Sequence, residues 1–184
     1  FQALGLKSLG THPFEQAVRR YRGSSLHIGG QSRPAPLYPL ECNAISPQTI
    51  PLGGIEGPLV YVGSGELARC NGRQIEGAVI LMELDSGKNW QYAASLGALA
   101  LIYVDRNGAS RALLESKMEL TPIHFPRFWV PLEEARERFG DFESAAKGVV
   151  AQQVRLASDV RWEEALTENV YGLIPGSNPE LDRK

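Results

Sequence analysis

Two strongly apolar runs stand in the middle of the chain, separated by a short amphipathic stretch. The first run spans residues 79–84, with Glu83 as its one charged residue, and the second spans residues 99–104. Runs of this length without polar alternation are typical of strands that a sheet buries on both faces. The stretch between them predicts a helix, whose shared face consists of Trp90, Ala93, Ala94 and Gly97. The pattern therefore predicts a parallel β-α-β unit with a right-handed crossover.

A further helix is predicted near the start of the chain, over residues 11–23. In "THPFEQAVRRYRG", four apolar residues fall at positions i, i+3, i+4 and i+7, which is one face of a helix. Thr11 or His12 would cap this helix, Pro13 suits its first turn and Gly23 suits its end. The four apolar residues are Phe14, Ala17, Val18 and Tyr21.

The remaining segments complete the prediction of an α/β domain. Residues 31–57 carry five prolines, which favours an extended, turn-rich segment. The other predicted elements are strands over residues 58–63, 124–131, 148–162 and 170–174, and helices over residues 131–140 and 142–147.

Composition narrows the functional classes. The 184 residues are 43% hydrophobic and 22% charged, as in ordinary soluble domains. A net charge of -2 without a basic stripe argues against nucleic acid as a partner. The longest apolar run, residues 98–104, is far shorter than the roughly 20 residues of a membrane-spanning helix. Cys42 and Cys70 lack metal-ligand spacing, and they are either two free thiols or one disulfide.

One glycine motif resembles a dinucleotide fingerprint. Gly63, Gly65 and Ala68 follow a predicted strand, and Asp85 ends the next one. However, the Asn71-Gly72 turn signal leaves room for only about one or two helical turns, whereas a pyrophosphate site needs a full helix. Nucleotide binding is therefore the weaker interpretation.

No complete catalytic set is recognisable. The three histidines, His12, His27 and His124, occur in no H-E-x-x-H or His-x-Asp motif, and Ser64 lacks the frame of a nucleophile elbow. The best local candidate for a contact surface is the loop after the first buried strand, because ligands of open α/β sheets bind beyond the carboxyl ends of strands. An equally good alternative is that Asp85 or Ser86 in this loop caps the following helix.

Several stretches, in their order, resemble the protease-associated domain of zinc exopeptidases, the group that includes glutamate carboxypeptidase, bacterial aminopeptidases and the transferrin receptor ectodomain. The core of the resemblance is "QIEGAVILMELDSGKNWQYAASLGALALIYVDRNG". It is preceded by "NAISPQTIPLGGIEGPLVYVGSGELA" and followed by "FPRFWVPLEEARERFG". The sequence departs from the family at Gly77-Ala78 and at residues 84–87, which replace the usual Gly-Lys and Arg-Gly loop. The resemblance implies a swivelling β/β/α fold with a parallel β-α-β core, an antiparallel sheet and flanking helices.

The resemblance also implies a domain organisation. Residues 1–42 would be an N-terminal helix and an extended lead-in, and residues 43–166 the protease-associated domain. Residues 167–184, which include "TENVYGLIPGSNPE", are similar to the segment that begins the peptidase domain, with Val170–Ile174 as its first strand. The chain stops before any His-x-Asp of a two-zinc site, so we expect the zinc to belong to a catalytic domain outside this sequence.

The function that the resemblance implies is a non-catalytic domain that caps a peptidase active site and shapes substrate access, in a secreted or periplasmic protein. Its partners would be its own peptidase domain, a peptide substrate and a second copy in a homodimer, but not nucleic acid, and no membrane insertion is expected in this segment. The alternatives are a freestanding peptide-binding module and a nucleotide-binding α/β domain. The residues expected to face the substrate are Asp85, Lys88, Asn89, Trp90 and Arg106.

Overall fold

A computed structural model describes residue 3 and residues 7–40, 49–109, 111–115, 117, 121 and 123–174. The chain divides into two compact units. Unit 1 comprises Phe1–Arg20 and Trp162–Lys184, and unit 2 comprises Tyr21–Arg161. The domain boundaries expected after residues 42 and 166 stay predictions.

The strands form one eight-stranded sheet in the order β2-β1-β8-β4-β5-β6-β7-β3. Strands β4 to β7 are mutually parallel, whereas β1–β2, β3–β7 and β4–β8 pair antiparallel. The antiparallel strands thus continue the parallel sheet and do not make a second one. The strands are β1 Lys7–Ile28, β2 Ala35–Pro36, β3 Tyr38–Pro39, β4 Ile55–Tyr61, β5 Val79–Glu83, β6 Ala100–Asp105, β7 Arg127–Pro131 and β8 Val149–Leu173.

The predicted β-α-β unit is confirmed. Strands β5 and β6 are parallel, with Val79 opposite Ala100 and Glu83 opposite Val104. All six residues of β6 are buried, which explains why its sequence shows no polar alternation. Helix α2, Trp90–Ser95, connects the two strands and buries Trp90 and Ala93.

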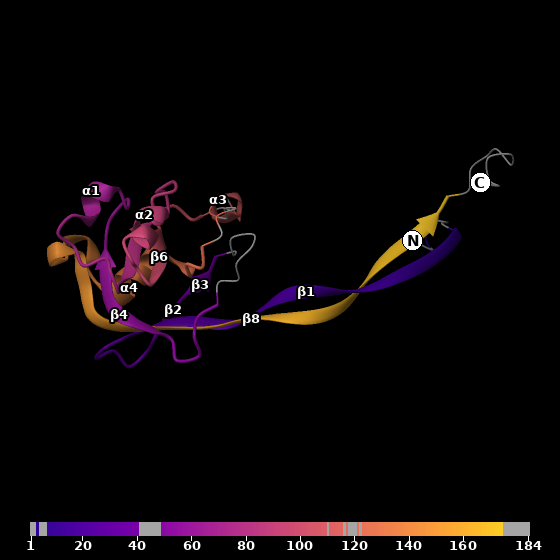
Figure 1. Ribbon diagram of the computed structural model, residues 1–184, viewed down its shortest axis with the longest axis horizontal. Helices are drawn as coiled ribbons and strands as arrows, with labels where there is room; N and C mark the ends of the chain where they lie inside the picture. The colour runs from indigo at the N-terminus through magenta and orange to yellow at the C-terminus, as the bar shows by residue number, and fades with distance from the viewer. Residues whose placement is uncertain are drawn as a thin grey trace. The chain divides into compact units, whose positions relative to one another are not determined.

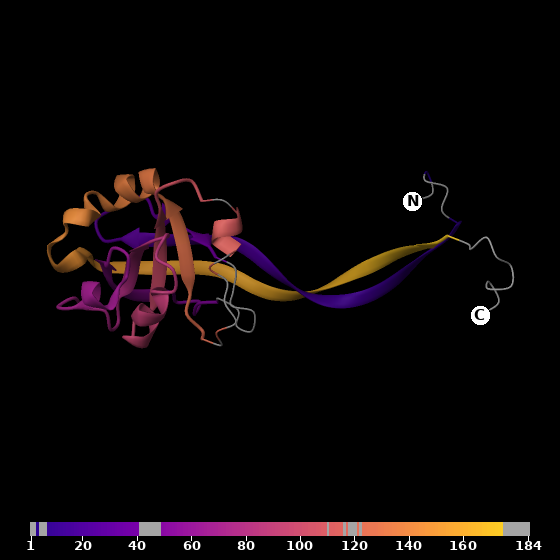
Figure 2. The same cartoon turned by 90° about the horizontal axis from the view of Figure 1, so that it is seen from above.

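Short helices cover both faces of the parallel strands in unit 2 (Figures 1 and 2). Helices α1 and α2 pack on one face, where Cys70 and Trp90 join the core. Helix α4 packs on the other face, where Ala135 and Phe139 join a second core. The helical segments are α1 Leu67–Cys70, α2, α3 Arg111–Glu115, α4 Leu132–Phe139, and the 3-10 helices η2 Phe142–Ser144 and η3 Ala146–Gly148.

Helix α4 confirms the prediction for residues 131–140. Pro131 occupies the N-cap position, and Gly140 ends the helix with a left-handed φ of 63°. Glu133 and Glu134 lie in the first turn and basic residues in the last, which complements the helix dipole. The predicted short helix over 142–147 consists of the two 3-10 turns η2 and η3.

The helix predicted over residues 11–23 is wrong, because these residues belong to β1. Phe14 and Val18 are four residues apart, and this spacing puts them on one face of a helix and also on one face of a strand. Ala17 and Tyr21, which the helix would have placed beside them, are exposed, whereas Phe14 and Val18 are half-buried. Pairing with β8 decides the outcome, because tertiary contacts override weak local propensity.

In unit 1, segments of β1 and β8 run beside each other. The side chains of Arg20 and Glu163 lie 3.6 Å apart, and the Tyr171 ring packs over Gly10. Residue 20 of β1 lies beside residue 163 of β8, whereas residue 10 lies beside residue 171, so the two strands are antiparallel. The strand predicted for residues 148–162 is confirmed, and β8 continues without a break through the strand expected at residue 170.

The close approach of β4 to the residues before β5 yields a testable prediction. Gly57 is buried, and a Cβ at this position would lie against the backbone oxygen of Gly77. Gly57→Ala should therefore lower the free energy of unfolding by roughly 1–3 kcal/mol, as overpacking does. Gly53 is exposed with open space around it, so Gly53→Ala is the matched control and should be nearly neutral. Equal denaturation midpoints for both variants would contradict the assigned contact.

Candidate functional site

The carboxyl ends of the parallel strands β4, β5 and β6 meet at one edge of the sheet, where ligands of open α/β sheets bind. The turns that follow these strands lie at residues 63–65, 84–89 and 106–109. The Asn89 side chain joins the first two turns, because its Nδ2 donates to the backbone oxygen of Ser64 at 2.9 Å. The sequence prediction concentrated on the second and third turns.

Arg106 is held at this edge by two carboxylates. Its Nε and Nη2 donate to the two oxygens of Glu83 at 2.5 and 2.7 Å, which is the bidentate geometry of a strong ion pair. Nη2 also donates to Glu143 of η2. The hydroxyl of Tyr61, at the end of β4, donates to Glu83, and its ring packs edge-on against Phe142. These contacts tie the ends of three strands to η2.

We call Tyr61, Glu83, Arg106 and Glu143 the Tyr61 cluster. Their surroundings shift the pKa values of Tyr61 and Arg106. Burial raises the pKa of Tyr61 to about 12, assisted by the hydrogen bond to Glu83 and by the negative charge of Glu83, while Arg106 opposes the rise. The pKa of Arg106 is raised as well, mainly by its hydrogen bond to Glu83. Arg106 therefore stays cationic, and Tyr61 stays neutral, at any physiological pH.

Asp105 shapes the third turn. The carboxylate is almost fully buried and accepts hydrogen bonds from the backbone N–H groups of Asn107 at 3.1 Å and Ala109 at 2.5 Å. Both oxygens thus serve the turn itself, so this side chain supports Arg106 and presents little of its own surface.

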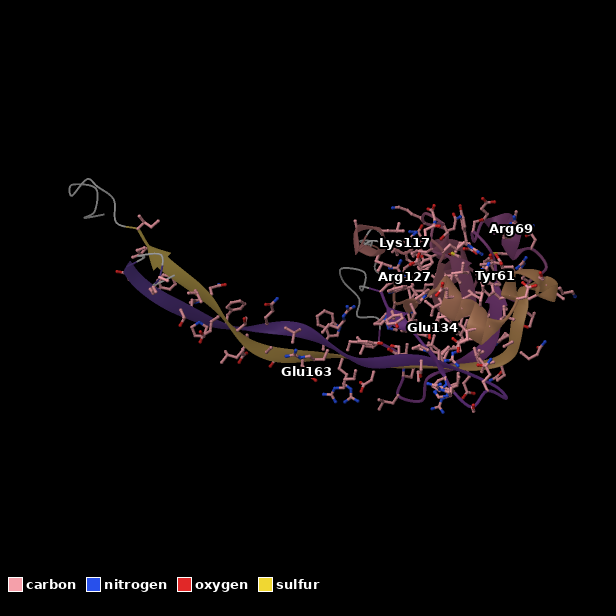
Figure 3. The ribbon with its side chains drawn as sticks, turned by 180° about the vertical axis from the view of Figure 1, so that it is seen from behind. Tyr61, Arg69, Lys117, Arg127, Glu134 and Glu163 are labelled. Carbon is pink, nitrogen blue, oxygen red and sulfur yellow. The ribbon has the colours of Figure 1, made fainter. Side chains whose placement is uncertain are left out.

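Trp90 lies in the core. Its side chain is 0% exposed, stacks on Phe125 with ring centroids 6.0 Å apart, and carries the Arg127 guanidinium 4.2 Å above its ring. Arg127 is itself buried and donates to the backbone oxygen of Lys117 at 2.7 Å, and these two residues lie near each other in Figure 3. Lys117 in turn donates to the backbone oxygen of Gly87 at 3.3 Å. Trp90 is thus an anchor for the turn, and its side chain offers no surface to a substrate.

The remaining predicted residues divide between exposed and supporting roles. Asp85 and Lys88 are exposed in the second turn, and Asn89 is a half-buried tie between turns. Helix α2 begins at Trp90 with Asn89 as N-cap, so the alternative that Asp85 or Ser86 caps it is wrong. A cavity of about 50 Å³ joins Asp85 to Arg106, and its lining consists of Glu83, Leu84, Asp85, Val104, Asp105, Arg106, Asn107 and Leu113.

Sequence reasoning missed Glu83, Glu143 and Tyr61. Glu83 carried a usable signal, because it is the one charged position in an apolar run, and a charge in a buried strand needs a partner. Glu143 carried none, since it lies 37 residues from Arg106 and only the fold brings them together.

A larger cavity of about 460 Å³ lies elsewhere in unit 2, and none of the predicted site residues lines it. Cys70, Arg73, Glu76 and Leu96 are among its lining residues. Cys70 is a free, buried thiol whose pKa is raised by burial and only partly lowered by Arg73. A thiol with a raised pKa has little nucleophilic thiolate. Cys42, with which Cys70 could form the disulfide considered in the sequence analysis, lies outside the described residues.

Helix α1 argues against a dinucleotide site at the motif of Gly63, Gly65 and Ala68. It has four residues, and the space beside Gly65 is filled by the Met82 side chain. Among the described residues, no group of three or more His, Cys, Asp or Glu side chains is placed to hold a metal ion. In the same part of the chain, no helix combines the length and apolarity needed to cross a membrane.

The arrangement is the protease-associated type of α/β fold. The chain is similar to an aminopeptidase from Aneurinibacillus sp. strain AM-1, with 17% identity and a TM-score of 0.56 over 97% of this chain and 41% of that one. A zinc aminopeptidase from Bacillus subtilis gives 16% identity and a TM-score of 0.58 over 96% and 39%. A peptidase M28 precursor from Shewanella amazonensis SB2B gives 15% and 0.50 over 92% and 41%.

The chain thus spans about two fifths of the length of these three proteins. No protein-family model matches the sequence, and no curated protein matches it either. At these identities the similarity establishes the fold, and the activity of the longer proteins is not transferred by it.

The Tyr61 cluster predicts a pH dependence. The folded pKa of about 12 lies above the value of 10.0 expected in the unfolded chain. The contribution of Tyr61 to stability is therefore complete below pH 10 and is lost as the pH rises through 12. Tyrosine NMR titration, with the Tyr61 signal assigned by its absence in Tyr61→Phe, measures this value directly.

Two variants separate the causes of the shift. Glu83→Gln removes the negative charge that favours the neutral phenol, so it should lower the pKa of Tyr61, whereas Arg106→Gln should raise it further. A shift in the same direction for both variants would rule out the proposed electrostatic coupling.

Proposed function

We propose that this chain is a non-catalytic protease-associated domain of a zinc aminopeptidase-like protein, in which it caps the active site and shapes substrate access. The observation that carries this proposal is the shared fold over nearly the whole chain with part of two longer aminopeptidases, one of them a zinc enzyme. In this proposal the zinc belongs to the peptidase region of the parent polypeptide, and the parent is secreted or periplasmic.

The surface proposed to face the substrate is the carboxyl edge of the parallel strands. Asp85 and Lys88 are exposed there with opposite charges, and Arg106 keeps about a third of its side chain exposed while two carboxylates fix its position. Fixed charges of both signs suit the polar backbone and termini of a peptide. Asn89 and Trp90 would act from beneath, by holding the turn that carries Asp85 and Lys88.

The proposal predicts a division of labour between this chain and its parent. The purified 184-residue chain should release no product from an aminoacyl-anilide in the presence of zinc, whereas the full-length parent should. Sequencing the gene beyond Lys184 should reveal a His-x-Asp and further Asp, Glu and His ligands. Zinc-dependent hydrolysis by the 184-residue chain alone, or a parent without such ligands, would refute the proposal.

In the full-length parent, Asp85→Lys should change kcat/KM for long peptides by about fivefold, which corresponds to roughly 1 kcal/mol, and should leave the aminoacyl-anilide unaffected. The small substrate would not reach the capping domain. Arg69→Ala on the exposed side of α1 is the control and should change neither substrate. An equal effect of Asp85→Lys on both substrates would place Asp85 away from the substrate path.

A further inference from the structure

The cavity of about 460 Å³ in unit 2 is formed by two helices and the turn between α1 and β5. Its lining residues come from α1, from residues 71–76 and from Leu96 at the end of α2. Helices α1 and α2 lie on the same side of the sheet (Figures 1 and 2). The turn and the end of α2 precede β5 and β6, so the cavity lies toward the amino ends of these strands. The turns of the candidate site follow the carboxyl ends, so the cavity is a different surface.

Backbone hydrogen bonds hold the wall of this cavity in place. The N–H of Arg73 donates to the backbone oxygen of Cys70 at 3.1 Å, which closes the turn after α1. The N–H of Gly77 donates to the backbone oxygen of Gly97 at 2.9 Å, which ties the same turn to the end of α2. Small-molecule sites are largely pre-formed and occupy about 300–1,000 Å³. The cavity meets both conditions.

Apolar side chains form part of the lining. Leu67 of α1 is 54% exposed and Leu96 of α2 is 39% exposed, whereas Ile75 between them in sequence is buried. Two leucines from different helices therefore leave apolar area in contact with water at the same cavity. Covering this area with an apolar group of a ligand is favourable.

The lining also contains one cation and one anion. Arg73 is half-buried, its Nη1 donates to the backbone oxygen of Tyr61, and a Cβ at Gly148 would meet its guanidinium, so its position is fixed. Glu76 is exposed, and its Cγ lies 3.1 Å from the position of a Cβ at Gly97. Within the described part of the chain, neither Arg73 nor Glu76 has an ion-pair partner.

This combination of side chains disfavours several classes of ligand. A wholly apolar ligand would cover Arg73 and Glu76 without satisfying them, and covering an unpaired charge is costly. A phosphate group would be attracted by the one guanidinium and repelled by the carboxylate of Glu76. A ligand with one carboxylate, one ammonium group and an apolar part complements the cation, the anion and the two leucines together.

We propose that this cavity binds a small zwitterion with an apolar side chain, which is the chemistry of a free amino acid or a dipeptide. The ligand carboxylate pairs with Arg73, the ammonium group pairs with Glu76, and the apolar side chain lies against Leu67 and Leu96. The proposal goes beyond the function proposed above and does not depend on it, because it concerns another surface and is tested on the 184-residue chain alone.

Backbone NMR titration of the 184-residue chain with leucine, and separately with leucyl-leucine, tests the site. At least one of the two should shift the signals of residues 67–76, 96 and 97 saturably, with a dissociation constant below about 1 mM. The C-amidated form of that ligand lacks the carboxylate and should bind about tenfold more weakly. The N-acetylated form lacks the ammonium group and should bind about threefold more weakly, because ion pairs with an exposed carboxylate are weak.

Variants assign each charge to its partner. Glu76→Gln should weaken binding of the zwitterion about threefold and leave the N-acetylated form unaffected. Arg73→Gln should weaken it about tenfold and leave the C-amidated form unaffected. Because Arg73 also supports the backbone at Tyr61, the exposed Glu76 decides the test if Arg73→Gln does not fold. Glu133→Gln is the matched control, since Glu133 is exposed in α4 on the other face of the sheet, and it should change nothing.

Three results would overturn the proposal. The first is the absence of saturable shifts up to about 10 mM of either ligand. The second is equal affinity for the zwitterion and both of its blocked forms, because the two charges would then not be recognised. The third is binding that the folded Glu76→Gln and Arg73→Gln variants leave unchanged, which would place the ligand elsewhere on the chain.

Discussion

The structure depends on burying strands β4, β5 and β6 on both faces. A sheet of this kind cannot leave one side in water, so the chain must supply helices to each face, and it does so with α1 and α2 on one side and α4 on the other. Parallel pairing also requires each strand to start from the same edge. The turns that follow β4, β5 and β6 therefore all lie at the opposite edge, together with their polar side chains.

At that edge the protein pairs its charges with each other. Glu83 stands at the end of a buried strand, where an isolated carboxylate would be costly, and Arg106 from the neighbouring strand satisfies it with two hydrogen bonds. Glu143 and Tyr61 complete the set from segments far away in sequence. These contacts therefore hold the strand ends together. They also support the turn in which Asp85 and Lys88 are exposed.

Helices and strands whose own residues specify their conformation were predictable from the sequence. The apolar runs of β5 and β6, and the capping and charge pattern of α4, specify their structures without reference to distant residues. The stretch from Thr11 to Gly23 lacks such information, because its i, i+4 spacing fits a helix and a strand equally, and only β8 resolves the choice. At the site, the position of their turn predicted that Asp85 and Lys88 are exposed, whereas their contact with a substrate stays a prediction. The role of Trp90 was not visible, since its partners Phe125 and Arg127 come from a segment that follows later in the chain.

The position of β8 has a consequence for how the chain folds. Strand β4 is synthesised well before β8, the strand that pairs with its other side, with Ile55 paired to Leu156. Closing so long a loop costs entropy before any contact repays it, so the final pairing should be a slow step. Until β8 pairs, one edge of a strongly apolar sheet stays unpaired, and unpaired strand edges make a folding chain prone to aggregation.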